Sequence, residues 1–159
     1  VFELMFLDEL GRFFLCLNTN TRKQILDVLN MIDSSSDTNS TILGDLILTI
    51  KALRNAVAHN SIVFDARFKD RDINQVVKHW TERDTGIKNI TLHSLSDYFI
   101  LLYCMLKRLD YSNTRARGLI LQYKDAETKL QEKVSKEAFD SIISNRAKQK
   151  MFDLESLIL

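Results

Sequence analysis

The chain has 159 residues, of which 45% are apolar and 27% charged, and its net charge is +1 at pH 7. This is the composition of one ordinary globular domain. No apolar run reaches the roughly 18 residues of a membrane span, and two cysteines do not make the disulfide framework of a small secreted protein, so we expect a cytoplasmic protein. Four glycines and no proline favour long helices, because both residue types interrupt regular elements.

Residues 1–50 predict two helices, a polar loop and the start of a third helix. Apolar residues three and four positions apart predict a helix over residues 1–17, with an aromatic core face formed by Phe2, Phe6, Phe13 and Phe14. Residues 18–20 end this helix, and Thr21 with Gln24 predicts a capping box at the start of a short second helix. The polar residues 34–40 predict an interhelical loop.

Apolar residues at helical spacing predict a third helix from about Thr41 to Ala58. The apolar stripe fixes this helix against the core and thereby fixes where its polar residues point. Asn55 and His59 are four positions apart and therefore share a face. Arg54 and His59 are five positions apart, about 7.5 Å of helical rise. Their long side chains can converge on a group the size of a phosphate near the helix end.

The pattern is irregular after the third helix and becomes helical again near residue 73. Residues 61–64 predict a short strand or a turn, residues 73–80 a short helix and residues 85–89 a turn. Ser94 with Asp97 predicts a capping box. It precedes the most apolar helix of the chain, which therefore belongs in the centre of a bundle.

The last third of the chain predicts further helices, over residues 115–133, 136–148 and 150–158. We therefore expect an all-α bundle. Its helical core covers residues 1–111, and residues 112–159 form a C-terminal helical extension packed on or beside that core. Cys16 and Cys104 each lie in an apolar run, so we expect two buried free thiols.

The charge is unevenly distributed along the chain. Residues 1–50 hold three Lys and Arg against seven Asp and Glu, residues 51–111 hold ten against seven, and residues 112–159 hold nine against seven. The positive part begins at the end of the third helix, which favours an anionic partner. A mixed solvated surface explains the same distribution nearly as well.

Most chemistry-bearing motifs are absent from the sequence. The scattered glycines exclude a phosphate-binding or dinucleotide-binding loop, and no serine nucleophile elbow is present. His59, His79 and His93 are not spaced as metal ligands, so we expect no metal and no cofactor. We interpret Asp97 and Asp110 as helix-end residues and His79 and His93 as structural residues.

The stretch Leu53-Arg54-Asn55-Ala56-Val57-Ala58-His59-Asn60, followed by Phe64-Asp65-Ala66-Arg67-Phe68, carries the one distinctive motif. Its pattern R-N-x-x-x-H resembles the signature of the HEPN superfamily. The sequence around it is similar to the Abi-like, or abortive-infection, branch of that superfamily, which is found in bacteria. The resemblance covers about residues 1–111. Abi-like proteins are usually longer, and the chain opens at Val1 inside an amphipathic pattern, so we expect it to be part of a longer protein.

The resemblance implies a toxin-type, metal-independent endoribonuclease of phage defence, with Arg54, Asn55 and His59 as catalytic residues. It also implies a homodimer in which two copies of the motif form one composite cleft on a two-fold axis. The expected partners are RNA and an antitoxin or regulatory protein, without a membrane.

The side chains themselves suit that chemistry. A histidine exchanges protons near neutral pH, and the RNA supplies its own nucleophile, the 2′-hydroxyl. An arginine offers a planar fork of donors to the phosphate oxygens, and Asn55 can hold the imidazole or contact the phosphate. Lys51, Asn60, Arg67 and Lys69 are candidate contacts to RNA phosphates.

Each residue of the motif also has a structural interpretation. Arg54 can pair with Asp45 or Asp65, Asn55 can be a helix-end residue, and His59 can be favoured by the helix dipole. The runner-up function is a non-catalytic helical module that binds RNA or a protein without cutting. A neutral scaffold within a larger defence protein is the third alternative.

Overall fold

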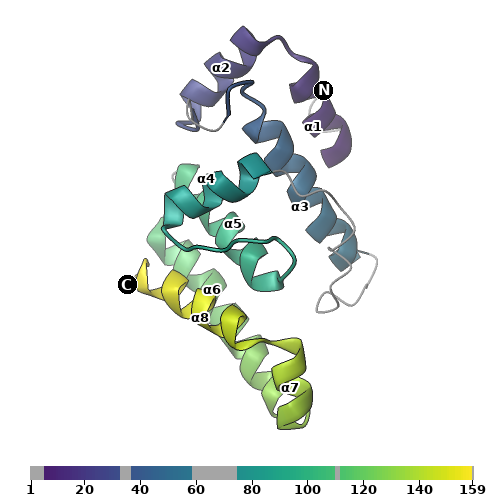
Figure 1. The fold of residues 1–159 in the computed structure, drawn as a ribbon, viewed down its shortest axis with the longest axis vertical. Helices are drawn as coiled ribbons and strands as arrows, with labels where there is room; N and C mark the ends of the chain where they lie inside the picture. The colour runs from purple at the N-terminus through teal and green to yellow at the C-terminus, as the bar shows by residue number, and fades with distance from the viewer. Residues whose placement is uncertain (1–5, 33–36, 59–74, 110–111, 159) are drawn as a thin grey trace.

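The computed structural model describes residues 6–32, 37–58, 75–109 and 112–158, and within these ranges the chain is all-helical (Figure 1). This confirms the predicted all-α class. The described elements are α1 (Leu7–Cys16), α2 (Thr19–Val28), α3 (Ile42–Ala58), α4 (Gln75–Thr85), α5 (Leu95–Arg108), α6 (Asn113–Gln131), α7 (Lys136–Ile142) and α8 (Asn145–Ser156). None of them is long and apolar enough to cross a membrane.

Helix α3, which carries the motif, begins where the sequence predicts, because a buried side chain caps it. The carboxylate of Asp37 accepts hydrogen bonds from the backbone N–H groups of Thr41 (2.8 Å) and Ile42 (2.9 Å). Asp37 is buried, so these bonds stay away from competing water. They satisfy N–H groups that have no partner within the helix.

Helices α1 and α3 pack antiparallel and very closely, because a glycine lies on each side of the contact. A Cβ atom on Gly11 would lie 3.0 Å from the side chain of Leu48, and one on Gly44 would lie 2.7 Å from that of Leu15. In the same antiparallel register, Asp8 contacts Lys51. The start of α1 therefore lies beside the C-terminal half of α3.

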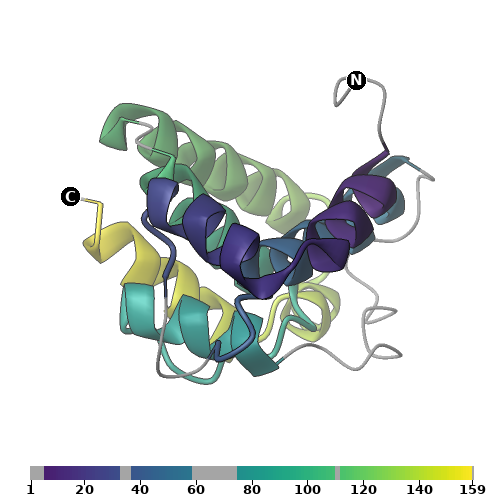
Figure 2. The same cartoon turned by 90° about the horizontal axis from the view of Figure 1, so that it is seen from above.

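Helix α5 lies at the centre of the core, as its apolar sequence predicts. Its fully buried Ile100 and Leu101 belong to one cluster with Leu46 of α3, Trp80 of α4 and Leu154 of α8. Along the longest axis of the molecule, α1 and α2 lie at one end and α7 at the other (Figure 1). Helices α6 and α8 both pack against α5, and Lys124 of α6 forms an ion pair with Glu155 of α8; Figure 2 shows the bundle from the α1–α2 end. Residues 1–111 and 112–159 thus share one hydrophobic core.

Several helix boundaries differ from the prediction. Helix α2 begins at Thr19, because Asn18 rather than Thr21 is its N-cap and accepts a 2.9 Å hydrogen bond from the N–H of Thr21. Helix α4 continues past residue 80 to Thr85. The break between the last two helices falls at residues 143–144, where Ser144 caps α8.

Three side chains that the apolar pattern places in the core are exposed instead. Phe14 is buried, but Phe6 and Phe13 are exposed, and so is Cys16. The reason is that α3 covers one face of α1, whereas the pattern continues around a second face. Cys104 is buried as predicted, and Phe2 lies outside the described residues.

Candidate functional site

The C-terminal half of α3 presents Arg54 to the surface and holds Asn55 beside it. The side chain of Arg54 is exposed and that of Asn55 is half-buried. Nη1 of Arg54 donates a 3.0 Å hydrogen bond to Oδ1 of Asn55. An arginine has five N–H donors and this bond uses one of them. The amide of Asn55 therefore orients the guanidinium at the end of the helix.

Lys51 lies one turn before this pair and is held by α1. Its Nζ donates to Oδ1 of Asp8 at 2.5 Å, and Arg12 bonds the other carboxylate oxygen at 3.1 Å. The hydrogen bonds from Lys51 and then Arg12 lower the pKa of Asp8 below its ordinary value. Of the predicted RNA contacts, Lys51 thus points at a carboxylate of its own chain.

The remaining predicted site residues, His59, Asn60, Arg67 and Lys69, lie outside the described residues. The structure therefore brings together Arg54 and Asn55, with Lys51 one turn away. Within the described ranges, no group of three or more His, Cys, Asp or Glu side chains is placed to hold a metal ion.

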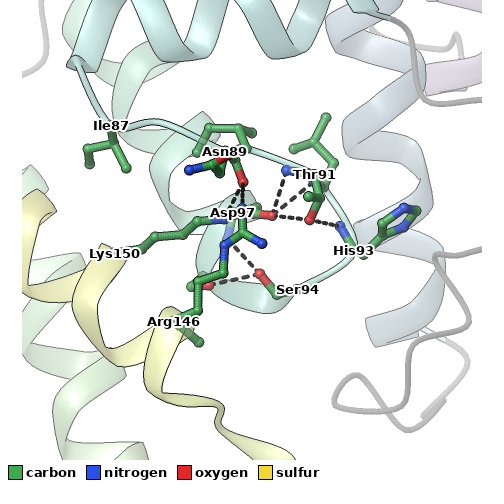
Figure 3. Close-up of polar contacts among 12 residues, drawn as sticks. Ile87, Asn89, Thr91, His93, Ser94, Asp97, Arg146 and Lys150 are labelled. Carbon is green, nitrogen blue, oxygen red and sulfur yellow. Dashed lines mark hydrogen bonds and ion pairs between the residues drawn. The ribbon is translucent and has the colours of Figure 1, made fainter.

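A second polar cluster, centred on Asp97, lies between α5 and α8 (Figure 3). Asp97 is fully buried, and its Oδ2 accepts hydrogen bonds from the N–H of Thr91 (3.0 Å), the hydroxyl of Thr91 (2.8 Å) and the N–H of Leu92 (2.9 Å). Its Oδ1 forms an ion pair with Lys150, which is also buried. We call Asn89, Thr91, Asp97 and Lys150 the Asp97 cluster.

Helix α8 also holds the backbone of the loop before α5. Lys150 donates a 2.8 Å hydrogen bond to the carbonyl oxygen of Asn89, and Arg146 donates one of 3.2 Å to the same atom. The sequence predicted Asp97 as a helix-end residue, which is its position, but not its contacts. The signal that points to them is a lysine inside the apolar stripe of α8, next to Met151 and before Leu154.

Beside the Asp97 cluster lies an open pocket of about 460 Å³. Lys88, Arg146 and Asp153 line it together with Gln149 and Lys150. Its charge is mixed, because Lys88 and Arg146 are positive and Asp153 is negative, while Asp97 compensates Lys150.

No protein-family model matches this sequence, and neither does any curated protein or solved structure. The class of the protein is therefore defined by its own fold and residues. It is an all-α protein in which an exposed Arg54 is hydrogen-bonded to a half-buried Asn55 near the end of one packed helix.

Proposed function

We propose that the chain is a cytoplasmic, metal-independent endoribonuclease of the HEPN superfamily, in its Abi-like branch, acting as a toxin in phage defence. The observation that carries the proposal is the hydrogen-bonded Arg54–Asn55 pair near the end of α3, with His59 four positions after Asn55 in the sequence. The motif supplies a phosphate-binding cation and a proton-transferring group within six residues.

The proposed reaction uses the RNA as its own nucleophile. The 2′-oxygen forms a bond to phosphorus while the bond from phosphorus to the 5′-oxygen breaks. His59 takes the 2′-hydroxyl proton as general base, and a second acid gives a proton to the leaving 5′-oxygen. The products are a 2′,3′-cyclic phosphate and a 5′-hydroxyl. Arg54, oriented by Asn55, stabilises the negative charge that builds on the phosphate oxygens.

A second copy of the chain would supply that acid as its own His59. Two exposed apolar side chains near the motif support a protein partner there. Val57 on α3 is 61% exposed and Phe6, two residues before Asp8, is 68% exposed. The Asp8–Lys51 contact places the start of α1 beside this part of α3. We therefore include a homodimer in the proposal, with the two motifs facing across its axis.

The test compares cleavage of single-stranded RNA by Arg54→Ala and Asn55→Ala with cleavage by Arg117→Ala, which removes an exposed arginine from α6. Loss of a group that stabilises transition-state charge costs roughly 10²–10³-fold in rate. We expect that loss for Arg54→Ala and a smaller one for Asn55→Ala, because Asn55 orients the guanidinium. Arg117→Ala should cut RNA at the wild-type rate. Equal rates for all variants would overturn the proposal.

The same preparations distinguish the enzyme from the binding module. A module would retain RNA in a filter-binding assay and release no product. Sedimentation of the same samples gives the oligomeric state. If a dimer binds RNA without cutting it, the motif is a binding element rather than a catalyst.

A further inference from the structure

The loop between α4 and α5 is held in a conformation that its sequence does not favour. Asn89 has φ 62° and Leu92 has φ 56°. A left-handed backbone is uncommon for residues other than glycine, and for a bulky residue such as leucine it is a true outlier. Such conformations persist only where the surroundings over-determine them, and they occur preferentially at functional sites.

The surroundings of this loop come from three helices. Glu82 of α4 accepts a 2.9 Å hydrogen bond from the N–H of Ile90. Asp97 of α5 accepts those of Thr91 and Leu92. Lys150 of α8 binds both Asp97 and the carbonyl oxygen of Asn89. Since Lys150 compensates the buried Asp97, the docking of α8 supports the whole arrangement.

The loop between α4 and α5 positions His93. Its N–H donates a 3.4 Å hydrogen bond to the hydroxyl of Thr91. Its ring is half-buried and points away from Asp97 toward α3 (Figure 3). Among the described residues, its buried Nδ1 has no hydrogen-bond partner. An unpaired buried nitrogen does not stabilise a ring position, so the hydrogen bonds that place His93 within the described part of the chain are those of the loop backbone.

We infer that His93 is a positioning residue for α3, the helix of the proposed catalytic motif, and that the Asp97–Lys150 pair holds His93 in place from α8. Its connection to RNA cleavage rests on the proposed function. The mechanical part stands alone: α8 holds the loop, the loop carries His93, and the ring of His93 points toward α3 (Figure 3). The C-terminal helix thereby controls the geometry of the motif helix.

Amide hydrogen exchange followed by mass spectrometry tests this directly, in the peptides that cover residues 42–57 and 86–94. His93→Ala should speed exchange of α3 by about tenfold. His79→Ala, which removes an exposed histidine from α4, should not. Because Nδ1 has no partner, His93→Phe keeps the ring and should keep the slow exchange. Unchanged α3 exchange in His93→Ala, or failure of phenylalanine to restore it, would overturn the inference.

The contribution of α8 is tested by Lys150→Met against Lys148→Met, the same change in an exposed ion pair of the same helix. Lys150→Met should speed exchange both in the loop and in α3, whereas Lys148→Met should change neither. If Lys150→Met speeds exchange in the loop but leaves α3 protected, α8 does not act on α3. Should Lys150→Met prove unfolded, Lys150→Arg, which keeps the charge, is measured in its place and should give a smaller effect in the same peptides.

The activity assay adds a readout that general stability does not give. A misplaced catalytic group lowers kcat by up to about 100-fold, whereas contacts that bind substrate and transition state equally act on KM. His93→Ala should therefore lower kcat with an unchanged KM, and His93→Phe should restore it. Equal kcat for His93→Ala and wild type would contradict the role in the reaction. If the wild type cuts no RNA, the proposed function fails while the exchange experiment still decides the positioning of α3.

Discussion

Lys150 of α8 and Asp97 of α5 form an ion pair inside the hydrophobic core, although 53 residues separate them. Each charge also has further hydrogen bonds, Asp97 from the loop before α5 and Lys150 to Asn89. A buried pair contributes little compared with apolar residues, but removal of one partner leaves an uncompensated charge. This pair therefore specifies how α8 docks on the core.

The first prediction concerns Lys150→Met, which leaves Asp97 buried and unpaired. Loss of one partner of a buried pair typically costs about 3–5 kcal/mol of unfolding free energy. Lys148→Met removes an exposed partner of Asp140, a kind of pair worth about 1 kcal/mol or less. Urea denaturation of both variants measures the difference. Equal urea midpoints for the two variants would show that the Asp97–Lys150 pair contributes no more to stability than the exposed Asp140–Lys148 pair.

The second prediction compares three glycines by Gly→Ala substitution. A methyl group on Gly44 would lie 2.7 Å from Leu15 and 3.2 Å from the carbonyl oxygen of Gly11, whereas one on Gly118 of α6 meets nothing within 4 Å. Gly44→Ala should therefore destabilise the protein by about 1–3 kcal/mol, and Gly11→Ala, at 3.0 Å from Leu48, by less. Gly118→Ala should stabilise it by about 0.5–1 kcal/mol.

These three values come from one set of urea denaturation curves. If the free energy of unfolding were the same for Gly44→Ala and Gly118→Ala, the result would contradict the close packing of α1 on α3.

Local sequence was sufficient to predict where α3 and α5 lie, because each helix combines a long apolar stripe with a cap at its N-terminus. It was not sufficient for the start of α2, where Asn18 and Thr21 are both good N-cap residues. Arg22 of α2 donates a 3.3 Å hydrogen bond to the carbonyl oxygen of Leu15, a contact across the turn that favours the earlier start. The exposure of Phe13 was missed because periodicity identifies an apolar face but not whether another helix covers it.

The candidate site was likewise predicted only in part from the sequence. The exposure of Arg54 follows from its place off the apolar stripe of α3. The partner of Lys51 does not, because Asp8 is 43 residues away. The contacts of Asp97 and His93 were missed for the same reason, since their loop is ordered by a helix near the other end of the chain.

The third prediction uses the two cysteines as probes of burial. Burial, and then the nearby Asp84, raise the pKa of Cys104 to about 12. At pH 8 only roughly one Cys104 thiol in ten thousand is then ionised, and the thiolate is the reactive form. Iodoacetamide should therefore label the exposed Cys16 alone, and Cys16→Ser should abolish labelling until urea unfolds the chain. Rapid labelling of Cys104 in the folded protein would show that the core around α5 is open.

The fourth prediction concerns Asp8, whose pKa is lowered by hydrogen bonds from Lys51 and then Arg12. Asp8→Asn releases the charge of Lys51 on α3 and that of Arg12 on α1. If RNA binds there, affinity should rise, and the slope of log K against log salt should steepen by about 0.7 for each released cation that contacts a phosphate of a single strand. Filter binding at several salt concentrations measures this slope.

Asp140→Asn is the matched control, since it releases Lys148 on α8 in the same way. It should leave the slope unchanged. The same slope for Asp8→Asn and wild type would place the RNA elsewhere on the protein.

The most direct test of the proposed function is cleavage of end-labelled single-stranded RNA in excess EDTA by the wild type, His59→Ala and His79→Ala, with analysis of the product ends. We predict EDTA-resistant cleavage that yields 2′,3′-cyclic phosphate and 5′-hydroxyl ends, is lost in His59→Ala and persists in His79→Ala. Cleavage by His59→Ala at the wild-type rate, or intact RNA after incubation with a folded wild-type dimer, would contradict the assignment of this motif as a metal-independent ribonuclease.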